Sequence, residues 1–202
     1  MKLASVVLAG GTAVRFGGQK LSTLLADKPL LAFTLDAAAA AAENIVVVVG
    51  TAADVTGLVH AWSLTERRSV VVVAAANQTE GMGASLRAGL EAVGADVDGV
   101  FVFLGDMPFV PVGIFAAMVR ALAAGASATA PMFNGRRGHP VLLGREMIAQ
   151  RLLVGGNRGA ADLLSRDPGL VLIETRDDGV LFDVDTPDDF AEAIRRHALA
   201  WC

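Results

Sequence analysis

The sequence predicts an α/β fold with a mostly parallel sheet, and two observations lead to this prediction. Short, valine-rich segments alternate along the chain with longer segments of helical character. These short segments are apolar on both of their alternating faces, which is typical of strands covered by helices on two sides. The alternation therefore predicts βαβ units with right-handed crossovers.

The first half of the chain follows this alternation regularly. We predict strands over residues 3–9, 45–49, 70–74 and 99–104. We predict helices between these strands and after the last of them, over residues 29–42, 53–63, 83–93 and 111–124. Strand, helix and strand in this order form successive crossover units of one sheet.

The second half is less regular, and its candidate strands are residues 126–132, 139–143, 170–174 and 180–183. A closing helix begins after Thr186, whose hydroxyl can cap it. Pro187 suits the first turn, and Asp188 and Asp189 oppose the helix dipole. Because the chain has no repeat, linker or low-complexity tail, we expect residues 1–202 to form a single domain.

Composition excludes several classes of protein. Lys and Arg number 17 against 21 Asp and Glu, so a net charge of −4 disfavours binding to nucleic acid or to an anionic membrane. Hydrophobic residues make up 53% of the chain, which excludes a disordered protein. The single cysteine, Cys202, allows neither an intrachain disulfide nor a cysteine-based zinc site. The N-terminal apolar run is too short for an export signal, and we expect a cytoplasmic protein.

A glycine-rich loop directly follows the first predicted strand. Gly10 and Gly11 let the backbone pass close to a ligand, and Arg15 and Lys20 add positive charge to the same loop. Gln19 before Lys20 excludes a Walker A loop, in which the lysine follows a glycine directly. The residues predict a cradle for a triphosphate, and the alternative is an ordinary turn with two solvated cations.

Two carboxylates are candidates for a metal site. Asp106 comes just past the carboxyl end of the fourth predicted strand, where ligands bind in open α/β sheets. Asp185 precedes the capped closing helix, and Asp183 competes with it for the same role. Two carboxylates suit Mg²⁺, which takes phosphate and water oxygens as its other ligands. The alternative is that these residues only form a turn and a helix cap.

Two further polar segments are candidate binding sites. Residues 81–85 open a helix, where free N–H groups favour polar partners and Ser85 can read the edge of a base; the alternative is a glycine turn with a helix cap. Residues 134–140 begin with an Asn-Gly hairpin signal, and Arg136 and Arg137 could clamp a phosphate there. The alternative is a solvated turn, in which His139 either orients a ligand or packs.

The motifs together resemble the nucleotidyltransferases with a MobA-like fold. Residues 8–20, LAGGTAVRFGGQK, resemble the signature LA(A/G)GxSxRMGxxK, with Ala13 and Phe16 in place of the usual Ser and Met. Residues 79–86 resemble the base-recognition turn of this family, and residues 104–108 resemble its metal-binding strand end. Residues 137–140, 155–160 and 182–187 resemble segments of its molybdenum cofactor cytidylyltransferase branch, although Asn157 replaces the usual Asp.

The resemblance implies a three-layer α/β/α, Rossmann-like fold of the nucleotide-diphospho-sugar transferase type. It implies Mg²⁺-dependent transfer of CMP from CTP to the phosphate of molybdopterin or the molybdenum cofactor, with release of pyrophosphate. The implied catalytic residues are Arg15, Lys20 and Asp106, and the implied metal ligands are Asp106 and Asp185. The implied nucleotide-binding residues are Leu8, Ala9, Gly10, Gly11, Lys20, Gly81, Met82 and Ser85. The implied acceptor-binding residues are Arg137, Gly138, His139 and Arg158.

Three other functions stay open. The sequence LAGG at residues 8–11 is common in the guanylyltransferase branch, which uses GTP. A sugar-1-phosphate nucleotidyltransferase shares the first loop, but it gives no reason for the segment at residues 137–140. A non-catalytic chaperone that delivers the cofactor would need no metal-bound triphosphate. In the preferred interpretation the partner is a xanthine-dehydrogenase-type molybdoenzyme, and neither nucleic acid nor a membrane takes part.

Overall fold

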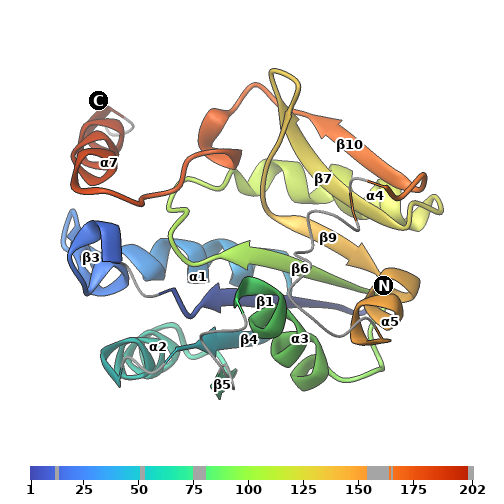
Figure 1. Cartoon of the computed structure of the whole chain (residues 1–202), viewed down its shortest axis with the longest axis horizontal. Helices are drawn as coiled ribbons and strands as arrows, with labels where there is room; N and C mark the ends of the chain where they lie inside the picture. The colour runs from blue at the N-terminus through green and yellow to red at the C-terminus, as the bar shows by residue number, and fades with distance from the viewer. Residues whose placement is uncertain (12–13, 51–52, 75–80, 154–163, 165, 200–202) are drawn as a thin grey trace.

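A computed structural model describes residues 1–11, 14–50, 53–74, 81–153, 164 and 166–199. Its main sheet has the strand order β10-β7-β9-β6-β1-β4-β5, with β8 paired to β7 (Figure 1). The predicted α/β class is confirmed, because most of the sheet is parallel and helices flank it. The strands are β1 Leu3–Ala9, β4 Asn44–Val49, β5 Val70–Ala74, β6 Gly99–Leu104, β7 Ala128–Phe133, β8 Arg136–Arg137, β9 Val141–Gly144 and β10 Leu170–Glu174.

The parallel part of the sheet is built around β1. It pairs with β4 on one side and with β6 on the other, and β4 pairs with β5, all in parallel. β9 runs antiparallel between β6 and β7, and β10 pairs in parallel with β7 at the far edge. The carboxyl ends of β1, β4 and β6 consequently lie at one edge of the sheet, on the left in Figure 1.

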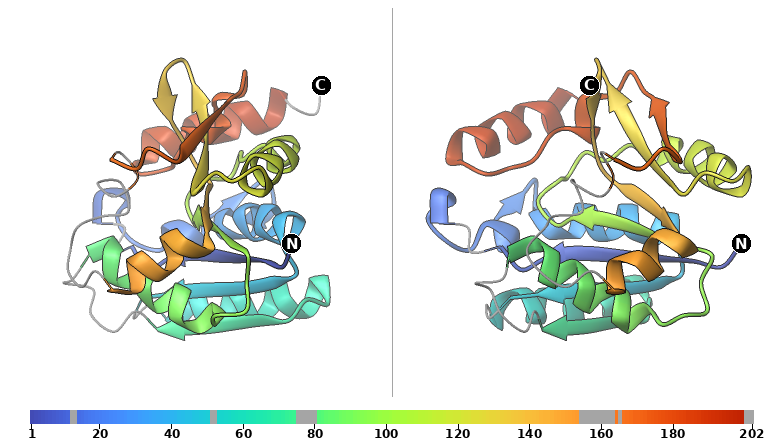
Figure 2. Two further views of the ribbon diagram at one scale, coloured as in Figure 1. Left: turned by 90° about the vertical axis from the view of Figure 1, so that its right-hand side faces the viewer. Right: turned by 45° about the vertical axis from the view of Figure 1, so that its right-hand side comes forward.

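Helices cover the sheet on both faces, as the two-sided apolar strands require. Along β1, Val7 packs into a core with α1 and α4, whereas Val6 packs into a second core with α3 and α5. Figure 2 shows these two helix layers on opposite sides of the sheet. The helices are α1 Leu30–Ala41, α2 Ala53–Glu66, α3 Gly81–Val93, α4 Phe115–Ala123, α5 Arg145–Leu153 and α7 Pro187–Leu199.

Short elements complete the carboxyl edge of the sheet. A third apolar cluster joins Leu25 and Leu30 to Val184 and Ala193, and it seats α7 on the hairpin β2-β3. No helix among the described residues is long and apolar enough to cross a lipid bilayer. The short elements are the 3-10 helices Val14–Phe16, Lys20–Ser22, Val112–Ile114 and Asp178–Val180, with the hairpin strands β2 Leu24–Leu25 and β3 Lys28–Pro29.

The prediction of a strand at residues 180–183 is wrong, because the structure has no strand there. The Asp177 side chain accepts a hydrogen bond from the Gly179 N–H at 2.9 Å, and this starts a 3-10 helix instead. The carbonyl of Val180 then accepts from His139, and the N–H of Val184 donates to Asp106. Each of these backbone groups makes one hydrogen bond to a separate loop, so the segment does not form the row of hydrogen bonds that pairs two strands. The helix α5 and the hairpin β2-β3 are additions that the sequence analysis does not predict.

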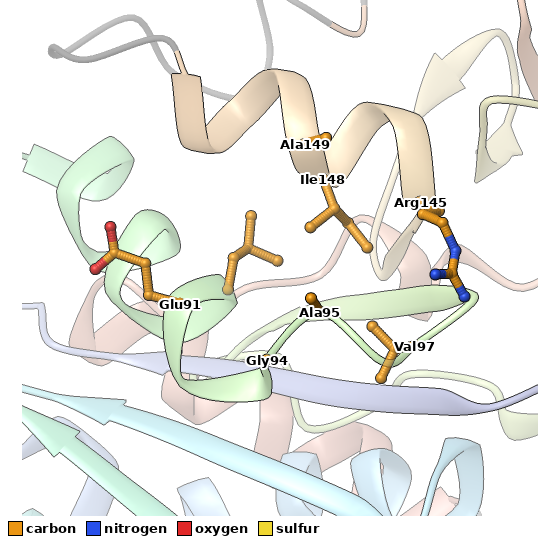
Figure 3. Close-up of a pocket in the computed structure, with 8 residues that line it drawn as sticks. Glu91, Gly94, Ala95, Val97, Arg145, Ile148 and Ala149 are labelled. Carbon is orange, nitrogen blue, oxygen red and sulfur yellow. The ribbon is translucent and has the colours of Figure 1, made fainter.

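A cavity of about 470 Å³ lies between α3 and α5 (Figure 3). Leu90, Val97 and Ile148 form much of its apolar wall, and Glu91 and Arg145 are charged residues of its lining. It lies at the amino end of β6, because Val97 precedes that strand. The cavity is therefore at the opposite end of β6 from Asp106.

The close packing of α3 against the sheet leads to a prediction about stability. A Cβ atom at Gly89 would lie 2.5 Å from Val6 Cγ1, and valine side chains are stiff. Gly89→Ala should lower the free energy of unfolding by about 1–3 kcal/mol through overpacking. Thermal unfolding would show this as a loss of about 2–4 °C for each kcal/mol.

Gly57→Ala in α2 is the matched control, because a Cβ there meets nothing within 4 Å. It should be neutral or should stabilise the protein by about 0.5–1 kcal/mol, from the higher helix propensity of alanine. Equal melting temperatures for the two variants would contradict the close packing of α3.

Candidate active site

The ends of β1 and β6 bring two predicted loops together. Leu8 is in register with Leu104, and the Gly105 N–H donates to the Leu8 carbonyl at 2.9 Å. A Cβ atom at Gly105 would lie 3.1 Å from that carbonyl oxygen, so this close approach favours glycine. Asp106 therefore lies next to the start of the glycine-rich loop at Gly10.

Lys20 is held between two carboxylates. Its side-chain Nζ lies 2.8 Å from Asp106 Oδ2 and 3.0 Å from Asp185 Oδ1, and the residue is only 7% exposed. Burial lowers the pKa of Lys20, but the hydrogen bonds and charges of Asp106 and Asp185 outweigh it and raise the pKa above its ordinary value. The ammonium is therefore charged at neutral pH, and it links the two carboxylates.

Asp185 is fixed by the start of α7. The Asp189 carboxylate accepts hydrogen bonds from the N–H groups of Asp185 at 3.1 Å and Thr186 at 2.7 Å. The Thr186 hydroxyl oxygen in turn accepts from the Asp189 N–H, which completes a reciprocal cap like a capping box. The N–H of Val184 donates to the Asp106 carbonyl at 3.0 Å. The helix start and this backbone bond together hold Asp185 beside Asp106.

Arg15 lies at the exposed rim of the same group. Its Nη1 lies 3.7 Å from Asp185 Oδ2, a long and solvated pair that contributes little stability. The next residue, Phe16, packs edge-on against Phe190 of α7, with 5.8 Å between the ring centroids. Phe16 thus ties the glycine-rich loop to α7, a contact that the sequence analysis does not predict.

Asp183 is a third carboxylate near the pair. Asp183 is an exposed residue, but desolvation of its carboxyl, followed by the charges of Asp106 and Asp185, raises its pKa. The like charges of Asp106 and Asp185 therefore act on Asp183, and the charge of Lys20 opposes them. Lys20 contacts Asp106 and Asp185, Arg15 pairs with Asp185, and the charge of Lys20 acts on Asp183. We refer to these five residues as the charge cluster.

The donor set of the charge cluster fits a hard divalent cation. Asp106 and Asp185 already share one cation, the Lys20 ammonium, between their oxygens. No group of three or more His, Cys, Asp or Glu side chains suited to a metal ion occurs in the described part of the chain. A site of this kind must therefore complete its ligands with oxygens of a substrate or of water, which is how Mg²⁺ is commonly bound with phosphates.

The predicted nucleotide-binding segments lie together. A Cβ atom at Gly10 would lie 3.5 Å from the Gly50 nitrogen and 3.7 Å from Ser85 Oγ, so Ser85 is a neighbour of the glycine-rich loop. α3 begins at Gly81, two residues before its predicted start, and Met82 is exposed. The first N–H groups of a helix are free to bind a ligand. Of the remaining predicted residues, Ala9 is buried and Gly11 is exposed.

The predicted acceptor hairpin forms as its Asn-Gly signal indicates. Asn134 and Gly135 both have positive φ angles, and they join β7 to β8, which carries Arg137. Gly138 is a point of close packing, since a Cβ atom there would lie 2.3 Å from the Val180 carbonyl oxygen. That packing is itself a reason for a glycine at this position.

The His139 ring is turned into the protein. Its Nδ1 is buried and has no hydrogen-bond partner among the described residues. Burial lowers the pKa of His139, a hydrogen bond with the Val102 backbone opposes this shift, and the positive charge of Arg137 adds to it. The nearby charge of Asp106 also acts on the ring and places His139 within electrostatic reach of the charge cluster. Arg158 and the predicted segment at residues 155–160 lie outside the described residues.

Comparisons with known proteins identify the family of the chain. Residues 5–170 match the family described as MobA-like NTP transferase domain. The chain is 30% identical over 132 residues to the molybdenum cofactor cytidylyltransferase of Escherichia coli, covering 64% of this chain and 65% of that protein. It is 35% identical over 137 residues to the 2-C-methyl-D-erythritol 4-phosphate cytidylyltransferase of Streptomyces avermitilis, covering 64% of this chain and 53% of that protein. The chain thus matches less than two thirds of the length of each relative.

Solved structures of similar fold cover nearly the whole chain. The crystal structure of Rv0371c from Mycobacterium tuberculosis has a TM-score of 0.77 and 26% identity, and the match covers 96% of this chain and 99% of that chain. Rv0371c in complex with manganese has a TM-score of 0.73 and 25% identity with the same coverage. Because the family match spans most of the sequence, this chain belongs to the MobA-like NTP transferase domain family, a family of nucleotidyltransferases.

Proposed function

We propose that this chain transfers CMP from CTP to the phosphate of molybdopterin or the molybdenum cofactor and releases pyrophosphate, in a reaction that depends on Mg²⁺. The observation that carries the proposal is the position of Lys20 between Asp106 and Asp185, beside a glycine-rich loop. The similarity to a molybdenum cofactor cytidylyltransferase supports the donor and the acceptor. We also propose that residues 1–202 act as a single domain.

The chemistry requires positioning and charge neutralisation. An oxygen of the acceptor phosphate forms a new bond to the α-phosphorus of CTP. The bond from that phosphorus to the oxygen bridging to the β-phosphate breaks, and pyrophosphate leaves with the electron pair. Because the attacking oxygen is already an anion, the reaction needs no strong base. Preorganised cations and N–H groups are then the main source of catalysis, as in phosphoryl transfer generally.

In this proposal, residues of the charge cluster and of the glycine-rich loop bind the triphosphate and the cation. Lys20 and Arg15 neutralise the triphosphate, and the N–H groups of Gly10 and Gly11 bind its oxygens. Asp106 and Asp185 would hold the cation, which would supply charge neutralisation at the α-phosphate of CTP. The manganese complex of the similar protein Rv0371c supports a divalent cation at this site. On binding, the Lys20 ammonium exchanges one or both carboxylates for phosphate oxygens.

Base and acceptor contact different segments beside the charge cluster in this proposal. Ser85, with Gly81 and Met82 at the start of α3, reads the cytosine, since Ser85 is a neighbour of Gly10. The acceptor lies against the hairpin that carries Arg137, whose guanidinium can hold a phosphate. Gly138 and His139 shape that side of the site, and Arg158 adds a second cation.

The biological setting is part of the proposal. We propose that the protein acts in the cytoplasm and that its product passes to a xanthine-dehydrogenase-type molybdoenzyme. Neither nucleic acid nor a membrane is needed for the reaction.

A second candidate acceptor has support from the similarity to 2-C-methyl-D-erythritol 4-phosphate cytidylyltransferase. This similarity also supports CTP as donor, because both curated relatives are cytidylyltransferases. The alternatives of GTP as donor and of a non-catalytic delivery protein each predict a different outcome in the two experiments below.

Asp106→Asn tests the role of the charge cluster in catalysis. Removing this charge should lower the rate of pyrophosphate release at least about 100-fold, the scale of losing one major electrostatic group. Asp188→Asn is the matched control, because Asp188 is an exposed residue in the first turn of the same helix that Asp185 precedes. A rate of Asp106→Asn within threefold of wild type would remove Asp106 from the mechanism, and a wild-type protein that binds cofactor without releasing pyrophosphate would be a delivery protein.

Nucleotide preference is tested by comparing kcat/KM for CTP and GTP with the same acceptor. We expect CTP to be preferred at least tenfold, which corresponds to about 1.4 kcal/mol and could come from a single base contact. Molybdopterin and 2-C-methyl-D-erythritol 4-phosphate should be tested in parallel with CTP. A tenfold preference for GTP would make the protein a guanylyltransferase, and turnover with the second acceptor alone would assign the other cytidylyltransferase activity.

A further inference from the structure

We infer that Thr34 is a positioning residue for the proposed metal ligand Asp106, because its buried hydroxyl meets the backbone of the turn that carries Asp106. Thr34 belongs to α1, and it is fully buried. Its Oγ1 lies 3.4 Å from the Leu104 carbonyl oxygen, 3.3 Å from that of Gly105 and 3.1 Å from that of Met107. The inference rests on the proposed function, which makes Asp106 a ligand.

The turn needs such a donor. At the end of β6 the chain leaves the sheet and its carbonyls need other donors. The Leu104 carbonyl accepts from the Met107 N–H at 3.3 Å, whereas Thr34 meets the carbonyls of the buried residues Gly105 and Met107. A hydroxyl can donate one hydrogen at a time, and the carbonyl of Met107 is the nearest of the three acceptors. If the hydroxyl is removed, the carbonyls of Gly105 and Met107 lose the donor of α1, and a buried acceptor without a partner is costly. The turn is then expected to shift toward another donor.

The contacts hold the peptide groups on both sides of Asp106. The carbonyls of Gly105 and Met107 meet Thr34, while the Asp106 carbonyl accepts from the Val184 N–H at 3.0 Å. The turn is thus held from α1 and from the segment that carries Asp185. A shift in the backbone would move the Asp106 carboxylate relative to Asp185. Mutation of a residue that positions a metal ligand commonly reduces metal affinity or activity 10- to 100-fold.

Thr34→Val tests this role, because valine keeps the shape of threonine and lacks the hydroxyl. The readout is the dissociation constant of Mn²⁺, measured by electron paramagnetic resonance in the presence of CTP and without acceptor, so that no turnover is involved. We expect at least about tenfold weaker binding for Thr34→Val. Thr34→Ser keeps the donor and should stay within threefold of wild type.

Ser5→Ala is the matched control for the loss of a buried hydroxyl. Ser5 is also fully buried, and its Oγ donates to the Ala38 carbonyl of the same helix at 2.9 Å, away from the turn. The Ser5→Ala variant should lower the melting temperature about as much as Thr34→Val does, and its Mn²⁺ binding should equal that of wild type. If Thr34→Val does not fold, Thr34→Cys replaces it, because a thiol is a weak donor and should again bind Mn²⁺ more weakly than Thr34→Ser does.

The outcomes separate this inference from the proposed function. Asp106→Asn is measured in the same assay and should abolish the Mn²⁺ site. Suppose that Asp106→Asn weakens Mn²⁺ binding. If Thr34→Val does not weaken it, or if Ser5→Ala weakens it as much as Thr34→Val does, the positioning role of Thr34 is overturned and the proposed function stands. If Asp106→Asn binds Mn²⁺ and CTP as wild type does, the proposed function fails, and the role of Thr34 fails with it.

Discussion

A lysine ammonium shared by two carboxylates is the interaction on which the candidate site depends. Lys20, Asp106 and Asp185 come from three distant parts of the chain, and Lys20 and Asp185 are 165 residues apart. Carboxylates this close to one another would repel without a cation between them. The Lys20 ammonium supplies that charge. Under the proposed function, a divalent cation replaces the ammonium between the two carboxylates, and the oxygens of a triphosphate replace the carboxylates as partners of Lys20.

The fold brings these groups together by joining strand ends to a helix start. Parallel strands place the glycine-rich loop and the Asp106 turn at one edge, and the close approach of Gly105 to Leu8 keeps the two loops in contact. The cap of α7 fixes Asp185 there, and Phe16 links the loop to the same helix. The candidate site is thus assembled by backbone contacts and helix capping as well as by the charges themselves.

The sequence predicts the parallel half of the fold well, because strands buried on two faces leave a continuous apolar pattern. It fails at residues 180–183, where the apolar pattern is similar but single tertiary hydrogen bonds replace a ladder. The helix α5 carries too mixed a pattern to stand out. Lys20 and Asp106 are found through their motifs, whereas Thr34 leaves no signal, since its role depends on three carbonyls about 70 residues away along the chain. Contacts of this kind become visible only once the fold is known.

A crystal structure with Mn²⁺ and a non-hydrolysable CTP analogue tests the central claim most directly. The account predicts anomalous density between the carboxylates of Asp106 and Asp185, with the Lys20 ammonium turned to the phosphate oxygens and the cytosine near Ser85. A nucleotide bound away from this edge, with Lys20 still bridging the two carboxylates, would contradict it.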